Sequence, residues 1–382
     1  MKSYADHLAD CRTLLFPRAV TRVAVAGSLG LTLAENVVAA ADSPTFASSA
    51  MDGYAVRVQD VPGSLAVVGE VAAGHVPDVP VAEGTAVRIM TGSAIPEGAE
   101  AVVPVEDTDE RDGRVTVRVA TTPQRHIRPA GDDVRAGDVV LRAGQVIAPA
   151  QLAALLTIGA ATVSVHPAAR VAVLSTGDEL VEAGRTPGPA QLVDSNGPAL
   201  AAAATAAGAD VVHVGRLPDA PDALVEAIES LPACDLVVTS GGISMGAYDV
   251  VKSALAPLGL VFEQVAIQPG KPQGWGRFPG GPAFLGLPGN PVSALVSFEL
   301  FGRAALGRER PTLRATLATR VARNAGDKRQ FLRGRLDGDR VHVDGGPGSH
   351  LVAGLAAADC LLVVPEGAKV LEEGSPVSVI PL

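Results

Sequence analysis

The sequence has few aromatic residues and few cysteines. Only 3% of its 382 residues are aromatic, whereas 47% are hydrophobic, so any core must be built mainly from Ala, Val, Leu and Ile. Cys11, Cys234 and Cys360 lie far apart and form no C-x-x-C pair. This spacing excludes a disulfide framework and a cysteine zinc site, and it favours a reducing, cytoplasmic setting.

Long apolar runs and dense basic clusters are also missing. No window holds about 18 uninterrupted apolar residues, so we expect no membrane span. Residues 1–15 mix charged and apolar side chains, which predicts an amphipathic helix rather than a signal peptide. The net charge is −10, and the absence of a basic face argues against nucleic-acid binding. An anionic small substrate would need local help from backbone N–H groups, a few placed cations or a divalent metal.

Apolar strands alternate with helices in the middle of the chain. This alternation predicts a mostly parallel sheet that is covered by helices on both faces. We therefore expect a doubly wound α/β domain over residues 169–310. Its expected strands are 170–176, 211–215, 235–239 and 283–287, and its expected helices are 196–207, 222–231, 249–258 and 291–306.

The remaining segments predict other modules, so the fold class is an α/β multidomain chain. Residues 47–128 alternate apolar and polar positions with frequent Gly and Pro, which is typical of a β domain. Helical patterns at 29–41 and 149–158 flank this insertion. We therefore expect a discontinuous helical domain made of residues 1–46 and 129–168. Short β runs over 311–382 predict a small C-terminal β domain.

Three unusual loops follow strands of the α/β segment. They read STGDEL (175–180), TSGGISMG (239–246) and LPGNP (287–291). Because parallel strands present their carboxyl ends at one edge of a sheet, the three loops should converge there. Gly241 and Gly242 allow the backbone to approach a ligand, and Ser240 and Ser244 add hydroxyl groups, so this loop suits an oxyanion. Ordinary Gly/Pro turns are the alternative, and the convergence disfavours it.

Several charged residues at these loops have two interpretations. Asp249 opens an expected helix, where a carboxylate is often only an N-cap, but together with Glu179 it also suits magnesium. Lys271 lies in a Pro/Gly-rich segment and either offers an ammonium to an anion or is a surface lysine. The segments around Asp52 and Thr91 read equally as tight turns or as functional sites.

Together these segments resemble the molybdopterin molybdenumtransferase family, which is related to the C-terminal part of eukaryotic gephyrin. Each piece is short, but the combination is specific and spans essentially the whole chain. The sequence GSH (348–350) and the arginine of FLRG (331–334) fit as well. The matching stretches are SAMDGYAVR (49–57), GEVAAG (69–74), RIMTGSAIPEGAEAVVPVEDT (88–108), STGDEL (175–180), DSNGPAL (194–200), TSGGISMG (239–246), PGKP (269–272) and LPGNPVSAL (287–295).

The resemblance implies a four-part architecture with a C-terminal β-barrel, and a homodimer whose cleft lies between subunits. It implies insertion of molybdate into adenylated molybdopterin with release of AMP, Mg²⁺ as cofactor, and contact with the molybdopterin adenylyltransferase. Carried over residue by residue, the catalytic positions are Asp52, Thr91, Glu179, Asp249 and Lys271, with Glu179 and Asp249 as metal ligands. The substrate-binding positions are Asp219, Ser240, Gly241, Gly242, Ser244, Gly246, Pro288, Gly289, Asn290, Arg333 and Ser349.

One position departs from the family pattern, and two rival functions need weighing. Gln268 stands where the family often has a lysine, so either the affinity for molybdate is lower or the attraction falls on Lys271. Molybdopterin adenylyltransferase is a rival of the same fold, but that activity needs only the single α/β domain. A non-catalytic scaffold of the gephyrin type is a rival of another class, and it would not require the carboxylate and Gly-Gly pattern.

Overall fold

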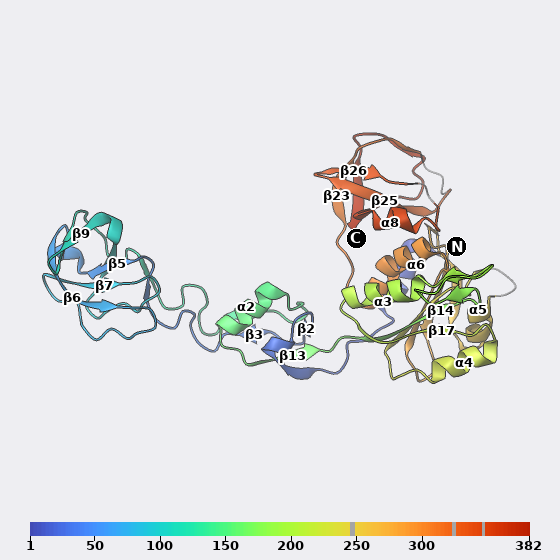
Figure 1. The fold of residues 1–382 in the computed structure, drawn as a ribbon, viewed down its shortest axis with the longest axis horizontal. Helices are drawn as coiled ribbons and strands as arrows, with labels where there is room; N and C mark the ends of the chain where they lie inside the picture. Colours follow the sequence, from blue (N-terminus) through green and yellow to red (C-terminus); the bar gives the residue numbers. More distant parts are fainter. Residues whose placement is uncertain (245–248, 323–325, 346–347) are drawn as a thin grey trace. The chain divides into compact units, whose positions relative to one another are not determined.

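The chain folds into two compact units, which Figure 1 colours by sequence. The computed structural model describes residues 1–244, 249–322, 326–345 and 348–382. One unit comprises Met1–Ala19 and Pro167–Leu382, and the other comprises Val20–His166. Among the described residues, none of the helices has the length and apolar character needed to cross a membrane.

A six-stranded sheet is the centre of the larger unit. Its strand order is β17-β14-β18-β22-β21-β19. The chain runs from β14 to the edge strand β17 and then returns past β14 to β18, so the strand order reverses between β14 and β18. Ligands bind at such a switch point, outside the carboxyl ends of the strands. The parallel strands are β14 (Arg170–Thr176), β17 (Asp210–Leu217), β18 (Leu236–Ser240) and β22 (Ala283–Leu287), and two antiparallel strands, β21 (Pro272–Arg277) and β19 (Val261–Gln264), extend the sheet beyond the predicted set.

Helices cover both faces of this sheet, as the alternation predicts. Along β14, Val171 and Val173 enter one core, whereas Leu174 enters the other. Figure 1 shows α3 and α6 on one side of the strands and α4 and α5 on the other. The predicted helix at 291–306 is continuous but contains a π-helical turn. The helices are α3 (Asn196–Ala206), α4 (Pro221–Glu229), α5 (Val250–Leu255), α6 (Pro291–Ser297), the π turn Phe298–Gly302 and α7 (Arg303–Ala305).

The N-terminal helix α1 (Tyr4–Arg12) also belongs to this unit. It confirms the amphipathic pattern at the start of the chain, and the Ser3 hydroxyl caps it by accepting from the Asp6 backbone N–H at 3.0 Å. Cys11 and Leu14 are buried in the core formed by α3, α6 and the sheet. Residues 1–19 therefore pack on the α/β domain within this unit, whereas the sequence prediction grouped them with the discontinuous helical domain.

The C-terminal segment forms a closed barrel beside the α/β domain, in agreement with the predicted β domain. The strands follow the order β20-β25-β26-β23-β29-β27, and pairing of β25 with β27 closes the sheet. Closure leaves no free edge among β25, β26, β23, β29 and β27, whereas the two-residue strand β20 pairs with β25 alone. The strands are β20 (Ile267–Gln268), β23 (Leu313–Leu317), β25 (Arg329–Asp337), β26 (Arg340–Val343), β27 (Cys360–Val364) and β29 (Pro376–Pro381); helix α8 (Val352–Ala356) and the pair β24 (Val321–Ala322) and β28 (Val370–Leu371) complete the segment.

The smaller unit contains the predicted β insertion. Its main sheet has the order β8-β5-β7-β6-β10-β9. Buried valines and alanines on both faces of these strands form its cores. The strands are β5 (Gly53–Val56), β6 (Gly63–Val71), β7 (Thr85–Ile89), β8 (Ala101–Pro104), β9 (Thr108–Arg111) and β10 (Arg114–Val117), with β4 (Ser48–Ser49) and β11 (Ile127–Arg128) paired separately.

The flanks of this insertion differ from the prediction. Residues 29–41 are not helical but contain β2 (Thr32–Leu33) and β3 (Val37–Val38). They pair with strands from beyond the insertion, and Leu33 is buried through that pairing. The predicted helix at 149–158 is present as α2 (Pro149–Thr157), so the flanks are mainly strands around one helix. The partner strands are β1 (Thr21–Ala24), β12 (Val139–Leu141) and β13 (Thr162–His166).

Candidate active site

The carboxyl ends of β14, β18 and β22 border a pocket of about 800 Å³. Residues from all three predicted loops line it, which confirms that these loops converge at one edge of the sheet. The lining includes Glu179, Asp219, Ser240, Gly241, Gly242, Ser244, Asp249, Pro288, Gly289 and Asn290, all of which the sequence singled out. Gly246, the remaining predicted residue of the second loop, lies outside the described residues.

The glycines of the second loop are required by close backbone packing. Gly241 and Gly242 have φ values of +96° and +67°, which favour glycine. A Cβ on Gly241 would meet the Thr176 Oγ1 atom at 2.6 Å, and a Cβ on Gly242 would meet a Val251 methyl at 2.7 Å. The Gly241 N–H donates to the Leu287 carbonyl at 3.0 Å. Gly241 and Gly242 therefore pack closely against neighbouring segments, and they present backbone atoms to the pocket.

Asn196, which was not predicted as a site residue, links the loops. Its Nδ2 atom donates to the Ser240 Oγ atom at 2.8 Å and to the Gly289 carbonyl at 2.6 Å. The Ser240 hydroxyl in turn donates to the Pro288 carbonyl at 3.1 Å. In the sequence Asn196 reads as a helix cap; only its place in the matching stretch DSNGPAL signalled another role.

Four acidic residues line the same pocket; Asp249, Asp219 and Glu179 are predicted site residues, whereas Asp194 accepts from the Gly197 backbone N–H. Asp249 occupies the N-cap position of α5 but makes no side-chain capping bond; instead the Ser244 hydroxyl lies 3.2 Å from both of its carboxylate oxygens. The Asp219 carboxylate accepts from the Asp178 backbone N–H at 3.0 Å. Glu179 supplies the third acidic group. The simple cap interpretation of Asp249 is therefore wrong, and its carboxylate is available to the pocket.

This set of donors suits a hard cation. Among the described residues these carboxylates do not gather into a group of three within 4.8 Å; the group that does is His7, Asp10 and Glu263, where the Lys2 ammonium is already bound. Magnesium keeps several waters and takes substrate phosphates as ligands, so one or two carboxylates are enough to bind it. Glu179 and Asp249 fit that requirement.

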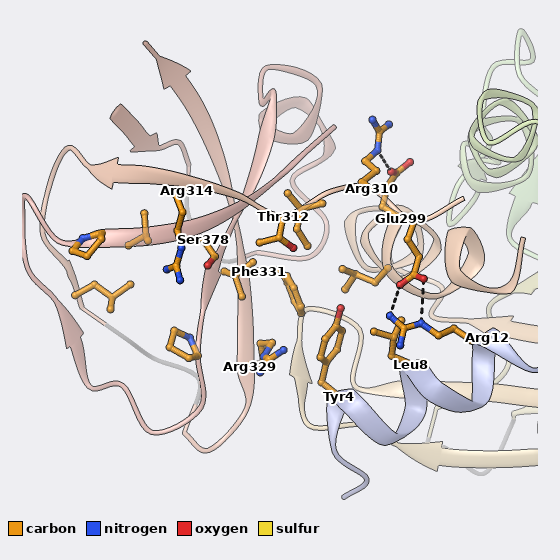
Figure 2. Close-up of a pocket in the computed structure, with 18 residues that line it drawn as sticks. Tyr4, Leu8, Arg12, Glu299, Arg310, Thr312, Arg314, Arg329, Phe331 and Ser378 are labelled. Atoms are coloured by element: carbon orange, nitrogen blue, oxygen red, sulfur yellow. Dashed lines mark hydrogen bonds and ion pairs between the residues drawn. The ribbon is translucent and has the colours of Figure 1, made fainter. Parts of the chain in front are cut away.

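A second pocket, of about 570 Å³, lies between α1, the segment that follows α7 and the outer face of the barrel (Figure 2). It contains none of the predicted site residues. Its charges are largely paired within the protein. Arg12 binds Glu309 at 2.9 Å, Arg310 binds Glu299 at 2.5 Å, and the Arg329 guanidinium stacks over the Tyr4 ring at 4.6 Å. The pocket at the switch point, with its carboxylates and open backbone, is the better candidate for chemistry.

Comparisons with known proteins identify the family of the chain. Residues 2–159 match the family model for the MoeA N-terminal region (domain I and II), 172–308 the probable molybdopterin binding domain, and 314–382 the MoeA C-terminal region (domain IV). Molybdopterin molybdenumtransferase 2 of Mycobacterium tuberculosis is 40% identical over 98% of this chain and 96% of its own length. The chain belongs to the molybdopterin molybdenumtransferase family.

Two further relatives extend this similarity to another bacterium and to a solved structure. The molybdopterin molybdenumtransferase of Haemophilus influenzae is 36% identical over 91% of this chain and 90% of its own length. The crystal structure of the molybdopterin biosynthesis MoeA protein of Pyrococcus horikoshii superposes with a TM-score of 0.77 at 31% identity, covering 99% of this chain and 98% of that one. The family architecture thus extends through both compact units of this chain.

The side chains of Gln268 and Lys271 do not line the pocket. These are the two positions at which the family resemblance suggested a cation. Lys271 is half-buried, and its neighbour Pro272 lines the pocket instead. Gln268 lies in β20 and pairs in register with Gln330 of the barrel strand β25. The segment therefore joins the α/β domain to the barrel, and the predicted attraction of molybdate by Lys271 stays a prediction.

Arg333 and Ser349 were predicted to bind the substrate, but neither residue lines the pocket. The Arg333 side chain is only 5% exposed and its guanidinium donates to the Leu351 carbonyl at 2.5 Å, so the structure does not bring it to the pocket. Ser349 accepts from the Asn290 amide at 3.0 Å. His350, which the prediction missed, lines the pocket. Arg333 thus positions the segment that carries Ser349 and His350.

Asp52 and Thr91 belong to the smaller unit and contact each other there. The Asp52 Oδ1 atom accepts from the Thr91 backbone N–H at 2.6 Å and from its hydroxyl at 2.8 Å. These two hydrogen bonds, the backbone bond first, lower the pKa of the Asp52 carboxyl below its ordinary value of 3.8. Ionised Asp52 therefore stabilises this turn above pH 3.8, and the contribution is lost as the pH falls through the lowered pKa.

Replacing Thr91 with alanine should raise the pKa of Asp52 part of the way back to 3.8, because the hydroxyl donor is lost while the backbone donor remains. Thr91→Ser keeps a hydroxyl and should leave the pKa lowered. An NMR titration of the Asp52 carboxyl carbon measures both variants. An identical Asp52 pKa in Thr91→Ala and the unmodified protein would contradict the assigned cause.

Proposed function

We propose that this protein inserts molybdate into adenylated molybdopterin and releases AMP. The observation that carries the proposal is the convergence of three loops, with Glu179, Asp219 and Asp249, at one switch-point pocket. The relatives named molybdopterin molybdenumtransferase support it, since they match over nearly the full chain. Extension of the match beyond the single α/β domain disfavours the molybdopterin adenylyltransferase alternative.

The pocket has to hold two anions together. The backbone N–H of Gly242 provides a donor for the phosphate groups of the adenylated substrate, in a loop that the Gly241 N–H anchors to the Leu287 carbonyl. Water hydrolyses the phosphoanhydride, so AMP leaves and the molybdopterin keeps its own phosphate. The two thiol sulfurs of the molybdopterin bind molybdenum in place of one molybdate oxygen, which leaves as water with the two thiol protons. Preorganised donors of this kind stabilise developing negative charge better than water does, because they need no reorientation.

We propose Mg²⁺ as the cofactor, held by Glu179 and Asp249. A bound magnesium ion would neutralise charge on the phosphoanhydride. The Ser244 hydroxyl, 3.2 Å from both Asp249 oxygens, orients that carboxylate. Lys271 contributes to the electrostatic attraction of molybdate, and Arg333 acts by positioning the segment of Ser349 and His350.

We also propose the assembly that the family resemblance implies. Asp52 and Thr91 complete the cleft in a homodimer, and contact with the molybdopterin adenylyltransferase delivers the substrate without release into solvent. A cytoplasmic location is consistent with three cysteines that are all free thiols. Size-exclusion chromatography with light scattering tests the dimer, and a monomer at micromolar concentration would contradict it.

An AMP-release assay tests the function. Purified protein is incubated with adenylated molybdopterin, molybdate and Mg²⁺, and AMP is quantified by chromatography. We expect AMP only when both molybdate and Mg²⁺ are present. Molybdopterin with ATP forms the parallel arm: pyrophosphate production there, without AMP release in the first arm, would support the adenylyltransferase. Substrate binding without turnover in either arm would support a non-catalytic scaffold.

A further inference from the structure

The side chains that line the switch-point pocket are acidic or neutral with one exception. Four of them are carboxylates, and among the described residues no lysine or arginine lines the pocket. His350 is the one basic residue in this described lining. The proposed reaction brings molybdate and a phosphoanhydride into the same pocket, so two anions meet a negatively charged lining. Magnesium offsets part of the repulsion, but an anionic oxygen that lies away from the metal still requires a hydrogen-bond donor.

The backbone around His350 is fixed by hydrogen bonds from α6 and β25. The Val292 N–H, near the start of α6, donates to the Ser349 carbonyl at 3.1 Å. On the other side, the Arg333 guanidinium of β25 donates to the Leu351 carbonyl at 2.5 Å. His350 therefore lies between two anchored residues, so its place at the pocket is set before a ligand binds.

The imidazole ring of His350 is exposed and has no hydrogen-bond partner among the described residues. The buried His7 differs, because its two ring nitrogens contact the Glu263 Oε1 atom at 3.2 Å and the Cys11 Sγ atom at 3.7 Å. An imidazole carries at least one N–H in either protonation state. His350 thus presents a donor that a ligand in the pocket can reach, whereas the ring of His7 is occupied within the protein.

His350 and the acidic residues approach the pocket from different strand ends. The strand order β17-β14-β18-β22 places β22 beside β18 and away from β14. Glu179 follows β14 and Asp249 follows β18, whereas His350 is anchored to α6, which follows β22. A magnesium ion held by Glu179 and Asp249 and the imidazole of His350 can therefore serve different anionic groups.

We propose that His350 is a substrate-binding residue whose ring N–H donates a hydrogen bond to an oxygen of a tetrahedral oxyanion. Molybdate and a phosphate of the adenylated substrate both present such oxygens. The inference rests on the proposed function. It gives the barrel domain a direct contact with the substrate, in addition to the positioning role of Arg333.

Two anions used as separate probes, molybdate and AMP, identify the group that His350 contacts. Calorimetric titration with Mg²⁺ present measures both affinities without turnover. We expect His350→Ala to weaken the binding of one anion about tenfold, as for the loss of one hydrogen bond to a charged acceptor. His350→Gln keeps an N–H donor and should weaken the same anion less. His342→Ala is the matched control, because His342 is an exposed histidine of β26 outside the pocket lining; it should change neither affinity.

NMR spectra of protein with ¹⁵N-labelled histidine separate a direct contact from a structural role of the same residue. The ring signals that are missing in His350→Gln are assigned to His350. We expect these signals to shift when the preferred anion is added to the unmodified protein, whereas the His342 signals stay in place. Thermal denaturation of each variant shows whether the fold is retained.

Three results would overturn the proposal. These are equal affinities of the unmodified protein and His350→Ala for both anions, ring signals of His350 that do not move at saturation, or no binding of either anion at millimolar concentration. AMP release by the unmodified protein is measured separately. Failure of that release with intact binding through His350 would reject the proposed function and not the role of His350.

Discussion

Asp249→Ala is expected to slow AMP release by about 10²–10³-fold, the range observed when one preorganised electrostatic group is removed. The fold should be retained, because the Asp249 side chain makes no capping bond to α5. What is lost is the carboxylate that the Ser244 hydroxyl orients at the pocket. Single-turnover release of AMP, with thermal denaturation alongside, measures both effects.

Two further variants establish whether the charge of Asp249 matters. Asn at this position still accepts from Ser244 but is a weak ligand for magnesium, so Asp249→Asn should be nearly as slow as Asp249→Ala. Glu226→Ala removes an exposed carboxylate from α4, away from the pocket lining, and should release AMP at the unmodified rate. Unchanged release by Asp249→Ala would remove this residue from the mechanism.

Gly241→Ala is expected to reduce the rate of AMP release by about 100-fold, because a shift of the substrate-binding loop by about 1 Å reduces a reaction rate by this factor. Its φ of +96° disfavours any side chain, and a Cβ there would lie 2.6 Å from the Thr176 Oγ1 atom and 3.0 Å from the Thr176 carbonyl oxygen. Because one of these atoms belongs to the backbone, the loop itself must move. The displaced loop no longer presents the Gly242 N–H to the substrate phosphate.

Gly259→Ala provides a matched control for this substitution. Gly259 has a similar φ of +90°, but a Cβ there meets nothing within 4 Å. Both variants should lose about 1–2 kcal/mol of stability from the left-handed conformation, whereas only Gly241→Ala should also lose activity. Denaturant unfolding and AMP release are measured on the same preparations. Equal activity of the two variants would show that the loop tolerates the added methyl group.

Most of the α/β domain could be predicted from local patterns. The run at 170–176 has a continuously apolar centre at 171–174 and is followed by turn residues, so it predicts a buried strand, and β14 occupies those residues. The helix at 291–306 was also predictable from its initial proline, although its π turn was not. Residues 29–41 were misread because a short apolar run does not distinguish helix from strand, and pairing with β12 and β13 decided the outcome.

The site was predictable in part. Convergence of the three loops follows from parallel strands alone, so it could be predicted without coordinates. The hydrogen bonds by which Asn196 links two of these loops could not be predicted, because Asn196 binds Gly289, which lies 93 positions away in the sequence. Arg333 carried a family match, yet its burial next to Gly345 and Gly354 is a matter of packing.

The amino-acid sequence by itself determined the alternation of strands and helices, the glycine-rich turns at the strand ends and the family of the protein. These features depend on residue types at short spacing, where side-chain periodicity and backbone conformational preference act. Tertiary structure alone decided which polar atoms meet across the pocket, which arginine is buried and where the N-terminal helix packs. Such contacts join distant segments, and their free energies depend on geometry that no local pattern encodes.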